Sequence, residues 1–480
     1  MNPLYRGPLQ RMHDQLAKQS VAPPPEAQGM VTTRLFAPVA QPPAYTDEAL
    51  ALEFAERHAG DLRYVAAWGK WLIWTGTHWR IDDTLQAVDH ARQICRDAAA
   101  SCKKGRTAAM LASAKTIAAV ERLAKADRRI AATVDEWDTN PWLLGTPGGT
   151  IDLRTGYLRQ ADPTESISKI TAVSPASSPD CPRFITFLNE ATGGDAALML
   201  FLQQYCGYCL TGVTREHALA FLSGGGKNGK TTFVNAITRP MGDYASTAAM
   251  DTFIAAHGDR HPTDLASLRG ARLVAASETE EGRRWAEARI KQLTGGDAIT
   301  ARYMRQDFFT FVPTFKLLIV GNHRPVLRNV DDAARRRFNI VPFDRKPANP
   351  DAQLEDKLRD EWPSILRWMI EGCLDWQRNG LLRAASVVET TNSYFSDQDL
   401  FGQWLDEKCD LEPSNLHKFG TSADLYASWS AYATAAGDRP GGQRSFSEAL
   451  QRRGVVMHRT KHARTYRGVA LRLMQGKGDG

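Results

Sequence analysis

The stretch SGGGKNGKTTF, residues 223–233, constrains the fold of this 480-residue chain more than any other. Gly224, four intervening residues, Gly229, Lys230 and Thr231 match the pattern G-x-x-x-x-G-K-[ST] in full. A glycine-rich turn at a helix start presents bare backbone N–H groups, which suit phosphate oxygens. The apolar run ALAFLS before it and the helix-like TTFVNAI after it provide the required context. The stretch therefore predicts a phosphate-binding loop, and a glycine-rich surface loop is the competing interpretation.

The expected ligand of this loop is ATP with Mg²⁺. The backbone of such a loop approaches the β-phosphate, Lys230 lies by the β- and γ-oxygens, and Thr231 holds the metal. The residues predicted to bind nucleotide are Gly224, Gly225, Gly226, Lys227, Asn228, Gly229, Lys230, Thr231 and Thr232.

The sequence around the loop alternates short apolar strands, ALAFLS, ARLVAAS and FKLLIVGN, with helical segments. This order indicates an α/β fold with a mostly parallel sheet covered on both faces. The N-terminal segment carries proline clusters and little periodicity. The C-terminal segment alternates helices with the strand-like stretches VVMHRT and TYRGVALRL. The predicted parts are a disordered Pro-rich arm (1–44), an N-terminal α+β domain (45–180), the P-loop ATPase domain with preceding helices (181–350), a helical lid or linker (351–399) and a basic winged-helix-like domain (400–480).

Three further stretches carry candidate catalytic groups. The strand in RLVAASETEEG ends at Ser277, so Glu278, with Glu280 as second choice, is expected to complete the Mg²⁺ shell and polarise the attacking water. Asn322 ends FKLLIVGN and could orient that water. Three arginines, Arg335, Arg336 and Arg337, precede the strand FNIVPF, and one of them could neutralise the transferred phosphoryl group of a neighbouring subunit. An acidic loop, a turn asparagine and a surface basic cluster are the respective alternatives.

Two regions are expected to bind DNA. IKQLTGGDAITARYMRQDFFTF reads as a hairpin with Arg302 and Arg305 near its tip and Lys291 before it, which could line a pore and grip phosphates. The segment 439–480 carries eight arginines and two lysines against two acids, within a chain of net charge +6. This asymmetry favours a polyanion partner, with a solvated basic face as the alternative. The candidate residues there are Arg459, Lys461 and Arg464.

Seven scattered cysteines argue against a disulfide framework. Cys206 and Cys209 form a lone C-x-x-C, which reads as two buried thiols. The uncharged run 196–214 approaches membrane-spanning length, but Gln203 and Gln204 favour a buried helix. The first 25 residues lack the apolar core of a signal peptide, so we expect a cytoplasmic protein.

The chain closely resembles superfamily 3 helicases of the phage/plasmid primase type in FLQQYCGYCLTGVTREHALAFLSGGGKNGKTTFVNAI, EARIKQLTGGDAITARY and LLIVGNHRPVLRNVDDAARRRFNIVPF. That group includes replication proteins of satellite phages and looks related to the poxvirus primase-helicases. DTNPWLLGTPGGTIDLRTGYL is similar to the domain that precedes these helicases, and residues 424–471 look like their C-terminal winged-helix domain. The resemblance covers about residues 45–473.

The resemblance implies an AAA+-type motor that forms a hexameric ring and moves 3′ to 5′ on DNA in a bacterial or phage-infected cell. Its Walker A motif falls on 224–231, its Walker B acid on Glu278, its pore hairpin on 291–305 and its sensor asparagine on Asn322. Its arginine finger falls on Arg336 or Arg337.

Two features depart from the family. The Walker B region has one acid at the strand end rather than two, and no catalytic acidic pair for primer synthesis is evident upstream, so a separate primase is expected. The predicted function is an ATP-dependent replicative DNA helicase of a phage, plasmid or integrated mobile element. An origin-binding initiator without processive unwinding and a DNA-binding regulator are the alternatives.

Overall fold

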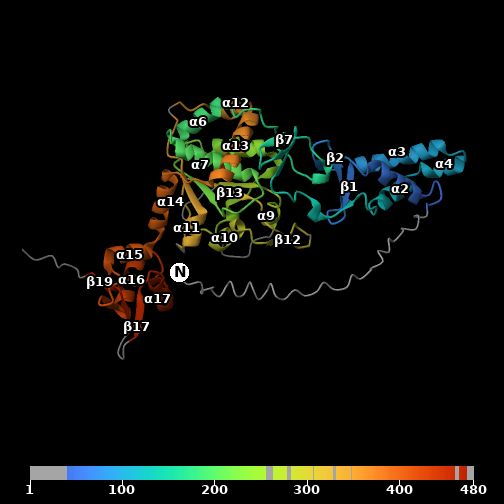
Figure 1. Ribbon diagram of the computed structural model, residues 1–480. Coiled ribbons are helices and arrows are strands. Elements are labelled where there is room, and N and C mark those ends of the chain that lie inside the picture. Colours follow the sequence, from blue (N-terminus) through green and yellow to red (C-terminus); the bar gives the residue numbers. More distant parts are fainter. Residues whose placement is uncertain are drawn as a thin grey trace, which may run out of the picture.

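The computed structural model describes residues 41–255, 263–277, 283–305, 307–327, 331–347, 349–459 and 464–472. Figure 1 shows a helical N-terminal part at one end, a central α/β part, and a small C-terminal part at the other end. Of the predicted Pro-rich arm, residues 1–40 lie outside the described residues.

Four helices pack together in the N-terminal part beside a small sheet. The first helix begins after Thr46, whose side-chain oxygen accepts a hydrogen bond from the Ala49 N–H at 3.2 Å. One buried core contains a residue from each helix, namely Phe54, Ile94, Leu111 and Val120. The strands of this sheet pair in the order β3-β2-β1-β4 and come mostly from the aromatic segment RYVAAWGKWLIWTGTHWR. The elements are α2 (Asp47–His58), β1 (Leu62–Val65), β2 (Lys70–Trp74), β3 (Trp79–Ile81), α3 (Gln86–Ser101), α4 (Gly105–Leu111), α5 (Ala114–Ala124) and β4 (Ala131–Ala132).

An antiparallel three-stranded sheet connects this part to the centre. The chain needs glycine at position 149, where φ is +131° and a Cβ would lie 2.2 Å from the Arg159 carbonyl oxygen. Ile151 is buried in the same core as Phe184 and Phe201 of the two following helices. The elements are β5 (Leu143–Thr146), β6 (Gly149–Asp152), β7 (Tyr157–Arg159), α6 (Pro182–Thr192) and α7 (Ala196–Leu210).

Five parallel strands form the central sheet in the order β14-β8-β13-β10-β9, as the alternation of strands and helices predicts. They are β8 (Leu219–Ser223), β9 (Ala245–Thr247), β10 (Leu273–Ser277), β13 (Lys316–Gly321) and β14 (Phe338–Pro342). Successive side chains of β8 point to opposite faces, so Ala220 and Leu222 join one core and Leu219 and Phe221 join the other. Both faces are therefore covered, and the strands read as unbroken apolar runs.

Helices from different parts of the chain supply the two covers. One face packs against α7, α8 (Lys230–Met241) and α13 (Trp362–Asn379). The other face packs against α9 (Thr263–Ala266), α10 (Glu287–Gly295) and α14 (Ala385–Gln398). The remaining helices of the central part are α11 (Asp332–Arg337) and α12 (Leu354–Arg359). The 3₁₀ turns are η1 (Val134–Glu136), η2 (Pro163–Glu165), η3 (Gly242–Tyr244) and η4 (Met250–Thr252).

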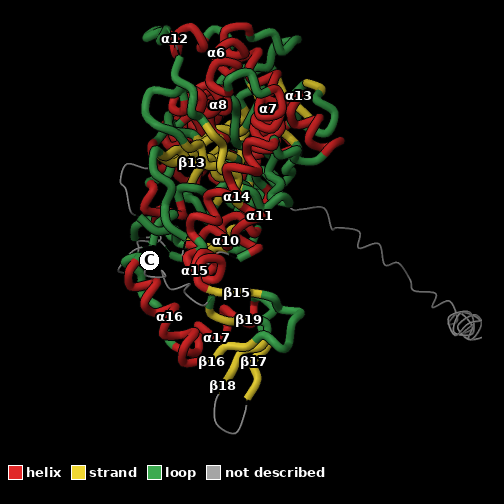
Figure 2. The backbone as a smooth tube through the Cα atoms, turned by 90° about the vertical axis from the view of Figure 1, so that its left-hand side faces the viewer, coloured by secondary structure: helices red, strands yellow, loops and turns green. Residues whose placement is uncertain are grey.

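The C-terminal part folds around its own core, which includes Trp404, Trp429 and Phe446. Figure 2 shows α16 and α17 beside the strands at the lower end of the molecule. The predicted strand TYRGVALRL splits in two at Gly468, where φ is +85° and a Cβ would lie 2.7 Å from the Pro413 Cα. The elements are α15 (Leu400–Lys408), β15 (Cys409–Leu411), β16 (Phe419–Thr421), α16 (Ser422–Ala435), α17 (Gln443–Arg452), β17 (Val456–Arg459), β18 (Arg464–Arg467) and β19 (Val469–Leu471).

Buried polar groups tie α7 to the sheet at the edge where its strands begin. The Lys316 ammonium donates to three backbone carbonyls, those of Thr211, Val213 and Thr314. Complete burial lowers the pKa of Lys316 to about 7. On α7, Cys206 and Cys209 are free and buried, as predicted, and burial raises the pKa of the Cys209 thiol to about 12. In the described ranges, none of the helices combines the length and the apolar character that crossing a bilayer requires.

Candidate functional site

The loop Gly224–Gly229 joins the end of β8 to the start of α8, so the predicted strand–loop–helix context is present. β8 lies between β13 and β14, and its last residue, Ser223, pairs with Gly321 on one side and Pro342 on the other. The carboxyl ends of these three parallel strands therefore meet at the loop. In open α/β sheets this edge is where ligands bind.

Two glycines fix the loop and two leave it open. A Cβ on Gly224 would lie 2.1 Å from the Phe343 carbonyl oxygen, and one on Gly229, where φ is +84°, would lie 2.7 Å from the Phe187 ring. Among the described residues, no heavy atom lies within 4 Å of a Cβ built on Gly225 or Gly226. The loop therefore presents bare, exposed backbone directly before a 12-residue helix, where N–H groups and the helix dipole favour an anion.

Lys230 lies beneath the loop with only 5% of its surface exposed. Its Nζ donates to the carbonyl oxygens of Gly224 at 2.6 Å and Gly225 at 3.3 Å, and to the Asn228 Oδ1 at 2.9 Å. Burial lowers the pKa of Lys230, and the nearby Asp344 carboxylate opposes that shift. Oxygens of the loop itself thus hold the Lys230 ammonium, in the region where a phosphate bound to the loop would lie.

Asn322 follows β13 and meets the loop from the neighbouring strand. Its Oδ1 lies 3.2 Å from the Lys230 Nζ. Because Gly321 pairs with Ser223, the residue after β13 necessarily reaches the start of the loop. The structure thus brings together two residues that stand 92 positions apart in the sequence.

Sequence reasoning assigned no role to Asp344 or Arg324, which the structure also places here. Asp344 follows the strand FNIVPF and acts electrostatically on Lys230. The Arg324 Nε donates to the Ser223 hydroxyl at 2.9 Å. Both follow a sheet strand at its carboxyl end, the signal that singled out Glu278 and Asn322. Asn228, predicted only as a loop member, also donates from its amide to the Phe343 carbonyl and so fastens the loop to β14.

The other predicted residues of the loop lie within the described part of the chain, whereas the predicted Walker B acids do not. Thr231 is exposed and Thr232 is half-buried in the first turn of α8, and Lys227 is exposed with φ +65°. β10 ends at the exposed Ser277, on the far side of β13 from β8. Glu278 and Glu280 lie outside the described residues, so their predicted roles stay predictions.

Arg336 and Arg337 lie at the end of α11, where the strands of the sheet begin, whereas the loop lies where these strands end. β14 pairs with β8 in parallel from Phe338–Leu219 to Pro342–Ser223. At a rise of about 3.3 Å per residue, the residues before β14 stand at least about 13 Å from the loop. Neither arginine can therefore reach the loop of the same chain. Arg336 is exposed, whereas Arg337 is half-buried and donates to the Ala333 carbonyl at 2.8 Å.

The predicted hairpin is formed by β11 (Ile299–Ala301) and β12 (Phe309–Phe311), which pair antiparallel. Arg302 and Arg305 lie in the connection between them. The Arg302 guanidinium stands 4.6 Å from the centre of the Phe308 ring, and Phe308 is 59% exposed. The turn therefore presents cations and an aromatic face together, a combination suited to a nucleic-acid strand.

Lys291 is separate from this turn. It lies on α10, and its Nζ forms an ion pair with the Asp331 carboxylate at 2.5 Å. Asp331 also accepts from the Ala334 N–H and so caps α11. The observed contact of Lys291 is thus with the helix that carries Arg336 and Arg337.

In the C-terminal part, Arg459 on β17 lies directly opposite Arg464 on β18. Lys461 falls between these strands, outside the described residues. Two like charges on facing positions repel one another, so an anion bound there would be stabilised by both.

Comparison with known proteins gives two family matches. Residues 51–193 match a family described as D5 N terminal like. Residues 222–337 match a family of unknown function, and this range includes the loop, Asn322 and both arginines.

Three curated relatives of this chain are viral proteins. The chain is 23% identical over 313 residues to "Putative helicase L207/L206" of Acanthamoeba polyphaga mimivirus, covering 60% of this chain and 32% of the relative. It is 28% identical over 244 residues to "Putative helicase 121R" of Invertebrate iridescent virus 3, covering 47% and 26%. It is 22% identical over 324 residues to "Putative primase C962R" of African swine fever virus (strain Badajoz 1971 Vero-adapted), covering 61% and 33%. The chain thus spans about a third or less of these relatives.

Among solved structures, the C-terminal region of NrS-1 is similar, with a TM-score of 0.49, 10% identity, and coverage of 88% of this chain and 100% of that one. The chain is thus similar to a D5 N-terminal-like domain in residues 51–193 and to viral proteins that are named as putative helicases and primases.

Proposed function

We propose that the chain is an ATP-dependent DNA helicase of superfamily 3 type, with ATP bound at the loop between β8 and α8. The observation that carries this proposal is the placement of Lys230. Its ammonium lies under exposed glycine backbone at a helix start and within 3.2 Å of Asn322 from the neighbouring strand. The names of the relatives agree with a replication helicase–primase function.

The loop residues fit a nucleotide with Mg²⁺. Gly225 and Gly226 leave space at the backbone, so phosphate oxygens could accept from the N–H groups there. Lys230 would exchange its contacts with the loop carbonyls for contacts with the β- and γ-phosphates. Thr231, exposed in the first turn of α8, and Glu278 would hold Mg²⁺, which neutralises charge on the phosphates.

Asn322 would orient the attacking water, and Glu278 would accept its proton. The Asn322 amide stands beside the Lys230 ammonium, so both groups would face the γ-phosphate from one side. Asp344 is the described carboxylate that acts on Lys230, and it is our candidate for the second acid that the strand β10 lacks.

Each site would be completed by a neighbouring subunit. Arg336 and Arg337 lie where strand β14 begins, whereas the phosphate loop lies where the neighbouring strand β8 ends. They can therefore act only on a phosphate bound to the loop of another copy. Arg336 is the exposed one and is our choice for the finger. A finger supplied in this way couples hydrolysis to assembly, and we propose the hexameric, AAA+-type ring and the 3′ to 5′ direction implied by the resemblance.

DNA would meet the chain at two places. The β11–β12 turn would enter the ring's pore, where Arg302 and Arg305 contact phosphates. The strands β17 and β18 would form the wing of a winged-helix domain, with Arg459, Lys461 and Arg464 on duplex or origin DNA. Primer synthesis would come from a separate primase.

Two measurements on purified protein test the proposal. Lys230→Ala should abolish ATP hydrolysis, and retained turnover would refute the assignment of the loop. On a forked duplex, the wild type should displace a strand with ATP. Hydrolysis and DNA binding without displacement would instead indicate an initiator or loader, and DNA binding without hydrolysis would indicate a regulator.

A further inference from the structure

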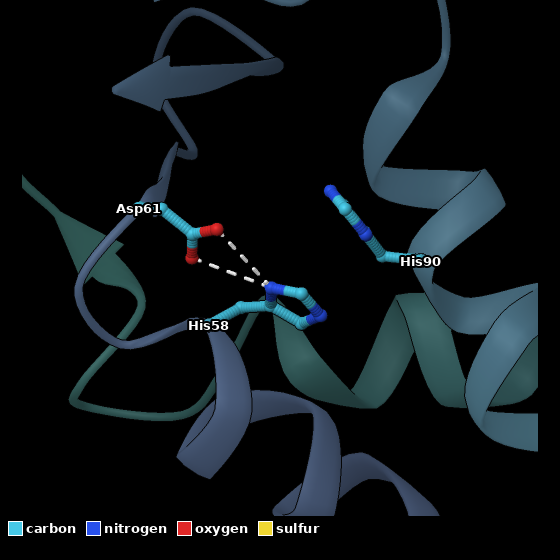
Figure 3. A group of neighbouring side chains, drawn as sticks. All are labelled: His58, Asp61 and His90. Carbon is cyan, nitrogen blue, oxygen red and sulfur yellow. Dashed lines mark hydrogen bonds and ion pairs between the residues drawn. The ribbon is translucent and has the colours of Figure 1, made fainter. Parts of the chain in front are cut away.

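Three metal-binding side chains converge in the N-terminal part, away from the phosphate loop. They are His58, Asp61 and His90, and each offers one ligand atom such that all these atoms lie within 4.8 Å of one another. Figure 3 shows the carboxylate and the two imidazoles around a common point, contributed by α2, the turn that follows it, and α3.

Backbone contacts hold two of these ligands in place. His58 ends α2, and the Asp61 N–H donates to the His58 carbonyl oxygen at 3.3 Å, which closes a tight turn. The Asp61 carbonyl accepts from the Trp74 N–H of β2 at 2.9 Å. Asp61 is therefore anchored to the sheet, and its carboxylate is directed back at the helix end.

The third ligand is positioned by a capped helix. The Asp82 carboxylate accepts from two N–H groups in the first turn of α3, those of Gln86 and Ala87, each at 3.0 Å. His90 lies one turn further along α3, which packs on α2 through the shared core. An ion bound by all three side chains would therefore cross-link α2, α3 and the start of β1.

The separation of His58 from Asp61 fits two ligands of a tetrahedral ion better than a hydrogen bond. The His58 Nδ1 lies 3.3 and 3.4 Å from the two oxygens of Asp61, beyond the usual hydrogen-bond range of about 2.7–3.2 Å. Ligands at about 2.0–2.1 Å from a tetrahedral Zn²⁺ stand about 3.3–3.4 Å apart. An ion could thus enter between the imidazole and the carboxylate without a change in their separation.

The ligand types narrow the choice of ion. Two imidazoles and one carboxylate suit Zn²⁺ and neighbouring transition metals, whereas Mg²⁺ and Ca²⁺ prefer oxygen ligands. The group that faces Asp61, His58, carries a charge only when protonated, so Asp61 supplies an anionic oxygen for a cation.

We propose that His58, Asp61 and His90 form a transition-metal site that binds Zn²⁺, with a fourth position open to water or to a donor from another molecule. The imidazole rings now lie 4.2 Å apart at 37°, so His90 turns about its side chain to direct a lone pair at the ion. The competing account is a metal-free polar cluster in which the His58–Asp61 ion pair and the contact of the two tilted imidazole rings hold α2 against α3.

The test uses the full chain without an affinity tag and the metals themselves as probes. After dialysis against Zn²⁺ and then metal-free buffer, the bound zinc is measured per chain. Co²⁺ titration, followed by its visible absorption, reports the coordination. We expect about one ion per chain and intense visible bands typical of a four-coordinate site.

Three variants separate the two accounts. His90→Ala and Asp61→Asn, the latter nearly isosteric, should each weaken binding by at least about 100-fold, since even outer-shell changes cost about 10–100-fold. The matched control is His78→Ala, which removes an imidazole that is hydrogen-bonded to Thr75 in the same part of the chain. It should bind Zn²⁺ as the wild type does. Zn²⁺ should raise the melting temperature of the wild type and of His78→Ala, but not that of Asp61→Asn. Failure of the wild type to retain zinc, or equal loss in the control, would overturn the proposal in favour of a metal-free cluster.

Discussion

Gly224→Ala is the substitution for which the structure gives the sharpest expectation. A Cβ at this position would lie 2.1 Å from the Phe343 carbonyl oxygen and 2.8 Å from the Phe343 carbonyl carbon. The Cβ would also lie 2.4 Å from the Asn228 Nδ2. The two Phe343 atoms are backbone and are fastened in place, because the Phe343 N–H donates to the Ser223 carbonyl at 2.7 Å and its carbonyl accepts from Asn228. The clash cannot be relieved by turning a side chain.

The size of the effect follows from this clash. An ordinary contact of about 3.4 Å or more requires the loop and the end of β14 to separate by more than an ångström. Overpacking of this kind costs about 1–3 kcal/mol of stability. The larger effect falls on the site, since a displacement of about 1 Å can reduce turnover about 100-fold. We therefore expect a folded protein with a small loss of stability and a loss of ATPase activity far beyond it.

The assay compares Gly224→Ala with Gly226→Ala by urea unfolding and by steady-state ATP hydrolysis. Gly226 has an ordinary φ, and no heavy atom of the described residues lies within 4 Å of its added Cβ, so its free energy of unfolding should change by less than about 0.5 kcal/mol. Equal stability and equal hydrolysis for wild type and Gly224→Ala would refute the close approach of the loop to β14.

Three further outcomes are expected. Arg305→Ala should lower the slope of log K against log salt for single-stranded DNA by about 0.7 and leave basal ATPase intact; an unchanged slope in fluorescence anisotropy would remove the β11–β12 turn from the DNA path. Joint replacement of Arg459 and Arg464 by alanine should lower the duplex-DNA slope by about 1.8, and no change would mean that these strands are merely a solvated basic face. Burial holds the pKa of Lys316 at about 7 against about 10.4 when unfolded, so unfolding between these values takes up a proton and stability rises with pH. From pH 7 to 8.5 the wild type should gain about 1–2 kcal/mol relative to Lys316→Met in urea unfolding, whereas parallel pH curves would contradict this assignment.

The elements of the central sheet are predictable because their patterns are strong and local. β8 and β13 are buried on both faces, so they appear in the sequence as unbroken apolar runs. The order β14-β8-β13-β10-β9 is not readable in this way, since it depends on which strands pair at long range. Likewise, Ile151 shares a core with Phe184, and no local pattern indicates that contact.

The candidate site likewise contains residues that local patterns predict and residues that only long-range pairing places there. The glycine pattern identifies Lys230, and the ends of apolar strands identify Asn322. The same rule applies to Asp344, but its closeness to Lys230 follows only from the pairing of β14 with β8. The ion pair of Lys291 with Asp331 escapes prediction because it joins α10 to the cap of α11 across 40 positions.

The central claim, a nucleotide site completed by a neighbouring subunit, is tested most directly by mixing two inactive proteins. The Lys230→Ala chain lacks the lysine of the phosphate loop but keeps the arginine finger. A chain with Arg336 and Arg337 both changed to alanine keeps the intact loop but lacks the finger. Steady-state ATP hydrolysis is measured for each protein alone and for an equimolar mixture after subunit exchange. We predict that each alone is inactive and that the mixture recovers part of the wild-type rate. A mixture that stays as inactive as its components, with exchange shown independently, would contradict the claim.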